Sequence, residues 1–174
     1  MRYREARPDD ALAIATLHAE SWRVAYRGMY RDDYLDGDVF QDRTNVWQER
    51  MAAPPESQFV VLAEDELGMA GFACAYGAHH ERLGTYLDNI HVRRELHRSG
   101  VGTALLSWVA SWSRTRYPDA GLYLGVLEEN VKARLFYERL GATDVGGDVV
   151  EPAGGGSVRV RRYAWSNDEL TSFS

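Results

Sequence analysis

The chain of 174 residues has the length of a single domain. Its composition, 45% hydrophobic with ten Tyr, five Trp and five Phe, excludes a disordered chain because so many apolar residues can bury a core. A formal charge of −6 argues against a nucleic-acid partner, which needs a concentrated basic surface, and no apolar run is long enough to span a membrane. The first residues lack the apolar stretch of a signal peptide, so we expect a cytoplasmic protein.

The first half of the chain predicts helices followed by hairpin strands. Pro8, Asp9 and Asp10 signal a helix start, and Gly28 and Pro54-Pro55 are stop signals. The acidic and glycine residues around 64–68 predict a hairpin turn. In order, we expect a strand at 2–7, a helix at 11–26, a turn at 30–36, a helix at 39–51, and strands at 58–63 and 69–76.

The second half predicts a loop at 77–84 and then alternating strands and helices. We expect a strand at 86–92, a helix from 101 to about 116, a strand at 121–127, a helix that Gly141 ends, and hairpin strands at 142–150 and 157–165. The polar residues from Ser166 are expected to fray. This order predicts an α/β fold of the α+β type, with a mixed sheet of six or seven strands flanked by about four helices. The domain would cover residues 1–166, with a polar tail at 167–174.

A strand, a glycine-containing loop and a helix follow one another between residues 87 and 103. The N–H groups of a first helical turn have no partner within the helix and favour a negative charge, and Gly100 and Gly102 would let a phosphate approach the backbone. The segment is not a Walker loop, and a dinucleotide fingerprint fails at Leu105. Two readings stay open, an anion site and a tight turn that only needs small residues.

A second pattern lies on the predicted helix that follows residue 130. Asn130 and Tyr137 are seven residues apart, so they fall on one helix face, about 10 Å from each other. Asn130 could instead be only an N-cap, and Tyr137 only a half-buried aromatic residue.

Together, these two segments resemble the motifs of the GNAT superfamily of acyl-CoA-dependent N-acyltransferases. The family pattern Arg/Gln-x-x-Gly-x-Gly/Ala matches residues 97–102, except that His97 stands first, with Arg98 beside it. The later pattern, with Asn, Ala, Phe-Tyr and Gly-Ala, matches residues 130–142. The resemblance implies a single GNAT-like domain whose central strands splay apart around an acyl-CoA slot.

The resemblance also implies the roles of site residues. Residues 98–103 would hold the CoA pyrophosphate, the backbone at Ile90 and Val92 would pair with the pantetheine arm, and Tyr137 would protonate the departing thiolate. The full set of expected acetyl-CoA contacts is Ile90, His91, Val92, His97, Arg98, Ser99, Gly100, Val101, Gly102, Thr103, Asn130 and Tyr137.

Two residues are candidates for the general base that the attacking amine needs. Asp88 stands where many family members carry Glu, and His91 has an ordinary pKa near 6.5. Strand alternation predicts that Asp88 faces the same side as Ile90 and Val92, and His91 the other side, unless a bulge upsets that order. We favour Asp88, with a purely structural carboxylate as the alternative.

The acceptor would bind outside these motifs. Trp22 and Tyr26 are four residues apart on one helix face, so they line a pocket or pack on the sheet. The acidic overall charge favours a cationic acceptor. Cys74 reads as a core residue, and His79 and His80 lack further ligands, so no metal is expected.

The sequence therefore predicts an N-acetyltransferase that moves an acetyl group from acetyl-CoA to a primary amine of a small molecule or protein by direct attack. The alternative is a catalytically silent module that binds or senses acyl-CoA. A homodimer is a further expectation.

Overall fold

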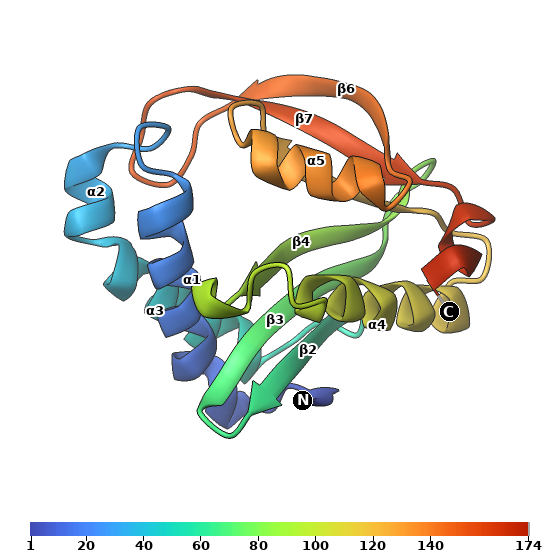
Figure 1. Ribbon diagram of the computed structural model, residues 1–174, viewed down its shortest axis with the longest axis horizontal. Helices are drawn as coiled ribbons and strands as arrows, with labels where there is room; N and C mark the ends of the chain where they lie inside the picture. The colour runs from blue at the N-terminus through green and yellow to red at the C-terminus, as the bar shows by residue number, and fades with distance from the viewer. Residues whose placement is uncertain (174) are drawn as a thin grey trace.

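The structure is a computed structural model that describes residues 1–173, and its centre is one seven-stranded sheet (Figure 1). The strands lie in the order β1-β2-β3-β4-β5-β7-β6. Every neighbouring pair is antiparallel except β4 and β5, which are parallel. The strands are β1 (Arg2–Glu5), β2 (Gln58–Asp65), β3 (Gly68–His80), β4 (Gly84–Val92), β5 (Leu122–Leu127), β6 (Thr143–Val150) and β7 (Val158–Trp165).

Helices cover both faces of this sheet. The α-helices are α1 (Ala11–Ala25), α2 (Asp32–Asp36), α3 (Val39–Ala52), α4 (Val101–Arg116) and α5 (Val131–Arg139). Three short 3₁₀ helices are η1 (Pro8–Asp10), η2 (Arg94–Leu96) and η3 (Glu169–Phe173). Helices α1 and α3 pack on one face of β2 and β3, and α4 packs on the other. The predicted α+β domain with a mixed sheet is confirmed.

Apolar residues on both sides of the central strands explain this layering. Along β2, Val60 and Leu62 join the cluster under α1 and α3, while Val61 and Ala63 join the cluster under α4. A strand that is buried on both faces reads as a continuous apolar run, as residues 59–63 do. Cys74 of β3 is fully buried, and burial raises the pKa of its thiol to about 12, as expected for a core residue.

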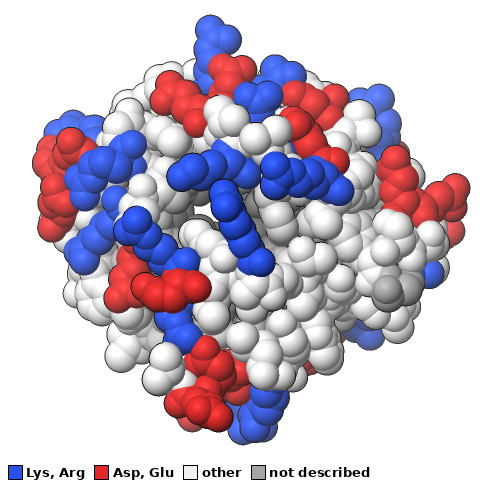
Figure 2. Space-filling view, viewed as in Figure 1, with Lys and Arg blue, Asp and Glu red and all other residues white. Residues whose placement is uncertain are grey.

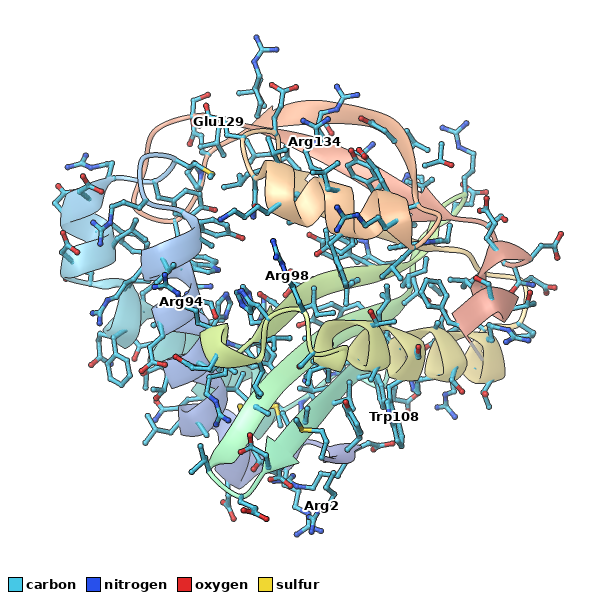
Figure 3. All side chains as sticks on the ribbon, in the orientation of Figure 1. Arg2, Arg94, Arg98, Trp108, Glu129 and Arg134 are labelled. Carbon is cyan, nitrogen blue, oxygen red and sulfur yellow. The ribbon has the colours of Figure 1, made fainter. Side chains whose placement is uncertain are left out.

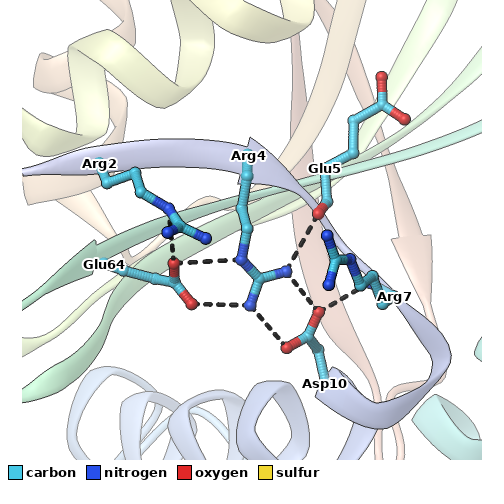
Figure 4. A network of polar contacts seen from close by, with 6 residues as sticks. All are labelled: Arg2, Arg4, Glu5, Arg7, Asp10 and Glu64. Atoms are coloured by element: carbon cyan, nitrogen blue, oxygen red, sulfur yellow. Dashed lines mark hydrogen bonds and ion pairs between the residues drawn. The ribbon is translucent and has the colours of Figure 1, made fainter.

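A network of charged side chains fixes the N-terminal strand to the sheet and to the start of α1 (Figure 4). The Arg4 guanidinium donates to the carboxylate of Glu64 on β2 at 2.7 Å and to that of Asp10 at 2.7 Å. Asp10 also accepts a hydrogen bond from the backbone N–H of Arg7. The two acids satisfy a partly buried guanidinium and connect β1, the edge strand, to β2 and to the start of α1.

The parallel strands β4 and β5 separate along their length. They pair at three positions only, from Thr85 opposite Leu122 to Leu87 opposite Leu124. Beyond these positions β4 continues to Val92 and β5 to Leu127 without pairing. The splayed strands implied by the family resemblance are therefore present, and they leave one edge of β4 open.

The structure corrects three expectations for local structure. Residues 77–80 extend β3 rather than forming a loop. A Cβ at Gly77 would lie 1.8 Å from the ring of Tyr117, so glycine at this position lets the tyrosine ring pack directly against the strand backbone. Part of the predicted turn at 30–36 is the short helix α2, which buries Tyr34 and Leu35. The predicted frayed tail instead forms η3, because Leu170 is fully buried in the core beside α4.

The turn between β6 and β7, near the C-terminal end of the chain, packs against α1 and α2 near its N-terminal end. In Figure 1 this turn extends from the terminal hairpin toward α1 and α2. Ala153 in the turn packs against a cluster that includes Trp22, Tyr34 and Leu35. Residues more than one hundred positions apart therefore share this corner of the molecule.

Candidate functional site

The open edge of β4 faces a hollow between α1, the start of α4 and α5. Figure 2 shows the hollow near the centre of this face, with Lys and Arg side chains around it. The overall charge is −6, so this local basic character is not a property of the composition. A site for a polyanion is consistent with such a rim.

The start of α4 is shaped as an anion site. Gly100 is its N-cap with φ of +88°, a conformation that favours glycine, and Ala104 donates to the carbonyl of Gly100 at 3.0 Å. The N–H groups of Val101, Gly102 and Thr103 precede the first helical hydrogen bond and are available to a ligand. A Cβ on Gly102 would lie 3.4 Å from the Phe136 ring of α5, an ordinary contact, so α5 packs directly beside this first turn of α4.

The residues before α4 have different tasks. His97 Nε2 lies 3.0 Å from the carbonyl oxygen of Val92, so its side chain closes the loop onto β4. Ser99 donates its hydroxyl to the carbonyl of Leu96 at 2.6 Å. Arg98 is exposed, has φ of +67°, and projects from the loop toward the space below α5 (Figure 3). Of the two neighbours His97 and Arg98, Arg98 is the one that can reach a phosphate.

Ile90 and Val92 lie beyond the last β4–β5 pair, on the open stretch of β4. Their side chains are partly buried against the core under α4. The unpaired edge of this strand offers backbone donors and acceptors to an extended ligand chain.

Tyr137 of α5 is buried, with 8% of its surface exposed, and its ring packs 5.2 Å from that of Phe136 and 6.2 Å from that of Trp165. Its hydroxyl has no hydrogen-bond partner among residues 1–173. Burial, together with nearby Tyr86, raises its pKa, so the phenol keeps its proton. Asn130 is the N-cap of α5 and accepts from the N–H of Ala133 at 3.3 Å.

Asp88 lies at a bulge that changes the face predicted for it. Cys74 of β3 pairs with Asn89 and Ala75 with Leu87, so Asp88 has no partner in the ladder. Its carboxylate turns to the α1–α3 side, where it accepts from Arg50 of α3 at 2.6 Å. The expectation that Asp88 shares a face with Ile90 and Val92 is wrong, because the extra residue reverses the alternation.

His91 lies on this same side of the sheet. Its ring is 4.6 Å from that of His18 on α1 and 5.3 Å from that of Phe72. Burial and the charge of Arg43 lower the pKa of His91 to about 3, so the imidazole is neutral at physiological pH. The predicted separation of Asp88 and His91 onto opposite faces is therefore wrong as well.

Aromatic residues from α1 and the segment after it complete the site. Trp22, Tyr26 and Tyr30 have ring centres 4.8 to 5.4 Å apart. Trp22 is buried, whereas Tyr26 is only partly so. Burial raises the pKa of Tyr26, with contributions from Tyr30, Tyr137, Tyr86 and Asp88, which places Tyr26 near the phenol of α5 and the carboxylate of β4.

Four residues of the site were not predicted: His18, which lies beside His91, and Tyr86, Arg43 and Arg50. Tyr86 of β4 lies between Tyr123 and the site, and burial followed by the charge of Asp88 raises its pKa to about 12. Arg43 and Arg50 of α3 bracket Trp47 at spacings of four and three residues, so all three share one helix face. That spacing was a usable signal, because two arginines on the apolar face of a helix need a buried partner.

The described residues, 1–173, contain neither a cluster of metal ligands nor a membrane-spanning helix. Within residues 1–173, no three His, Cys, Asp or Glu side chains are grouped so that they could hold a metal ion. His79 instead contacts the hydroxyl of Tyr123 at 2.5 Å. None of the described helices is both long and apolar enough to cross a bilayer.

Comparison with known proteins identifies relatives over most of the chain. The model of the acetyltransferase (GNAT) family matches residues 15–142. An uncharacterized N-acetyltransferase of Bacillus subtilis (strain 168), YuaI, is 30% identical over 154 residues, which cover 87% of this chain and 85% of that protein.

Solved structures show the same fold at lower sequence identity. A GCN5-related N-acetyltransferase structure from Rhodopseudomonas palustris superposes with a TM-score of 0.75 at 17% identity, covering 95% of this chain and 94% of that one. The PaiA N-acetyltransferase of Thermoplasma acidophilum, solved in complex with coenzyme A, gives a TM-score of 0.71 at 15% identity, covering 94% and 98%.

Proposed function

The chain belongs to the GNAT family and is an acyl-CoA-dependent acetyltransferase, and from that premise we propose that it transfers the acetyl group of acetyl-CoA to a primary amine by direct attack. The observation that carries the proposal is the unpartnered Tyr137 hydroxyl beside the open edge of β4. An extended pantetheine arm on that edge, with its pyrophosphate on the N–H groups of residues 101–103, would bring the thioester near this phenol.

The reaction needs two proton movements. The neutral amine nitrogen attacks the thioester carbonyl carbon, and a tetrahedral intermediate forms. The C–S bond then breaks, the sulfur takes a proton from Tyr137, and the nitrogen gives up a proton. Burial raises the pKa of the Tyr137 phenol, which makes it a weaker acid. The same surroundings also raise the proton affinity of the thiolate that is released there, so proton transfer from the phenol to the sulfur stays feasible.

Asp88 is our proposed acceptor of the amine proton, directly or through a water molecule. Its carboxylate is partly buried and lies near Tyr26 and Tyr86, on the side of β4 that faces α1. Asp88 can accept the proton only while its carboxylate is ionised. Accepting it would neutralise Asp88 and remove the charge that pairs with Arg50. His91 is the second candidate, although the burial that lowers its pKa and keeps its imidazole neutral also makes it a weaker base than an ordinary histidine.

Tyr137→Phe tests the proposal, because it keeps the packed ring and removes only the proton donor. We expect kcat to fall about 10- to 1000-fold with CoA affinity unchanged. The assay is thiol release from acetyl-CoA over a panel of primary amines, with calorimetry for CoA binding. Leu135→Ala, at an exposed position on the same helix, is the matched control and should keep the wild-type rate.

Two other results would contradict the proposal. An unchanged kcat in Tyr137→Phe, with chemistry rate-limiting, would remove the phenol from the reaction. Tight CoA binding without turnover of any amine in the panel would favour the silent module instead.

A further inference from the structure

Within residues 1–173, three buried N–H donors on the α1–α3 side of the site have no hydrogen-bond acceptor. They are Nε2 of His18, Nε1 of Trp22 and Nε of Arg43, on side chains whose residues are 0%, 9% and 9% exposed. An unsatisfied buried donor is costly and rare in a native protein. Three of them on neighbouring side chains indicate a group that the folded chain itself does not supply.

His18 is a donor at Nε2 for a definite reason. The indole N–H of Trp47 donates to its Nδ1 at 2.9 Å, and an indole nitrogen is a donor only. The neutral imidazole must therefore carry its proton on Nε2. Burial lowers the pKa of His18 well below its ordinary value, so the neutral form is the one present.

Arg43 is a buried cation that uses little of its hydrogen-bonding capacity. Its guanidinium donates to one acceptor within the described chain, the carboxylate of Asp42 at 2.9 Å, which also accepts from the hydroxyl of Tyr34. The guanidinium carbon lies 4.4 Å from the centre of the Trp22 ring. A guanidinium has five N–H groups in a planar fork, which is suited to a carboxylate.

The three side chains form one group next to the reaction centre. The His18 ring is 4.7 Å from that of Trp22 and 4.6 Å from that of His91. Tyr26 contacts Trp22 at 5.4 Å and lies within electrostatic range of Tyr137 and Asp88. A group held by the three donors would thus be separated from the thioester site by a single aromatic side chain.

The acids nearby do not offer a free negative charge to a polycationic acceptor. Asp88 is paired with Arg50, and Asp42 is bonded to Arg43 and Tyr34. The three unpartnered atoms are instead all hydrogen-bond donors, and a donor needs an acceptor such as a carboxylate oxygen. This is opposite to the cationic acceptor that the overall charge of −6 favours.

We propose that His18, Trp22 and Arg43 form the carboxylate subsite of the acceptor, so that the substrate is an amine that also carries a carboxylate, such as an amino acid. This inference rests on the proposed acetyl transfer and deepens it. Arg43 binds the carboxylate by charge, and the N–H groups of Trp22 and His18 complete its hydrogen bonds. Because these atoms are shielded from solvent, the acceptor would have to displace Tyr26 and Tyr30 to reach them.

The experiment compares pairs of acceptors that differ only in the acidic group. The pairs are the standard L-amino acids and their amides, together with β-alanine and 4-aminobutyrate and their amides, each with saturating acetyl-CoA. We expect the acid of at least one pair to have a kcat/KM about tenfold or more above that of its amide. Arg43→Gln should raise KM for that acid about 10- to 100-fold and leave the amide unaffected.

Two further variants keep the test independent of folding defects. Trp22→Phe removes the N–H donor and keeps a smaller aromatic ring, and Arg43→Lys keeps the charge and loses the planar fork. Both variants should raise KM more for the acid than for its amide. Arg27→Gln is the matched control, because it removes an exposed arginine paired with Asp32 and Asp36 and should change neither acceptor.

The outcomes separate this inference from the proposed function. Turnover with no preference for acids, or an acid preference that Arg43→Gln leaves intact, would overturn the carboxylate subsite and leave acetyl transfer standing. If no amine is turned over, calorimetry of the N-acetyl derivatives of the same acids with the CoA-loaded protein decides. Binding that is lost in Trp22→Phe supports the subsite, and no binding overturns it.

Discussion

The side of the slot made by β4 and α4 offers mainly backbone groups, whereas the side made by α1 and α3 offers buried side chains. On the first side, a separated strand edge and the first turn of α4 leave N–H and C=O groups open. On the second side, charges and ring nitrogens from three elements converge around His91. A backbone site tolerates many side chains, whereas the second site depends on each residue, and it is therefore the side that can determine the acceptor.

The largest expected effect is on the backbone side. Gly102→Asp places a carboxylate where we propose that the pyrophosphate binds, and a like charge at about 4 Å costs several kcal/mol in a partly desolvated site. We expect the Kd for CoA, measured by calorimetry, to rise about 100-fold or more.

Gly102→Ala is its matched control. The added Cβ would lie 3.4 Å from the Phe136 ring, an ordinary contact, so CoA affinity should stay within a few-fold of wild type. If Gly102→Asp binds CoA as tightly as Gly102→Ala does, the pyrophosphate site lies elsewhere.

A smaller effect is expected at Asp88, which belongs to β4 but turns its carboxylate to the α1–α3 side. Asp88→Asn should lower kcat/KM about 10- to 100-fold, with CoA binding nearly intact, and should alter the acidic limb of the pH–rate profile. The same change leaves the partly buried Arg50 without its partner, so the melting temperature should fall as well.

The double variant Asp88→Asn with Arg50→Gln separates these two causes. Recovery of stability without recovery of rate would support a role for Asp88 in proton transfer. Recovery of both would show that Asp88 only neutralises Arg50, and a profile altered instead by His91→Phe would assign the base to His91.

The smallest effect concerns the stability of the side-chain half. Burial lowers the pKa values of His18 and His91 below the 6.5 of the unfolded chain, so the unfolded state takes up protons first as the pH falls. Stability is therefore full above about pH 6.5 and is lost toward the folded pKa, which is about 3 for His91. Chemical denaturation should show that His91 alone contributes a loss of about 2 kcal/mol between pH 7 and pH 5.

His91→Phe keeps a ring beside Phe72 and should reduce that loss. His97→Gln, at an exposed position, serves as the comparison and should keep the wild-type slope. A loss of equal size in wild type and His91→Phe would mean that other groups cause the acid sensitivity.

The two sides also differ in how far the sequence reveals them. The backbone side is encoded locally, because Gly100, Gly102 and the helix that they open are adjacent in the chain. The succession of helices and strands along the chain was predictable for the same reason. The bulge at Asp88 has no such local signature, since it depends on pairing with β3. Contacts between α1, α3 and β4, such as those of Trp22 with Arg43 and of His18 with His91, arise only from the packing of distant segments.

The turn between β6 and β7 packs Ala153 against the corner formed by α1 and α2, so this corner cannot be completed until the C-terminal part of the chain has been synthesised. Residue 25 leaves the ribosome about 10 s before residue 153, at the usual rates of translation. During that interval Trp22 and Tyr34 lack the packing contact that Ala153 later supplies. Strand β5 likewise lacks β7, which later pairs with it. The newly made chain therefore exposes aromatic surface and an open strand edge until its last segment emerges, and both features favour aggregation during that period.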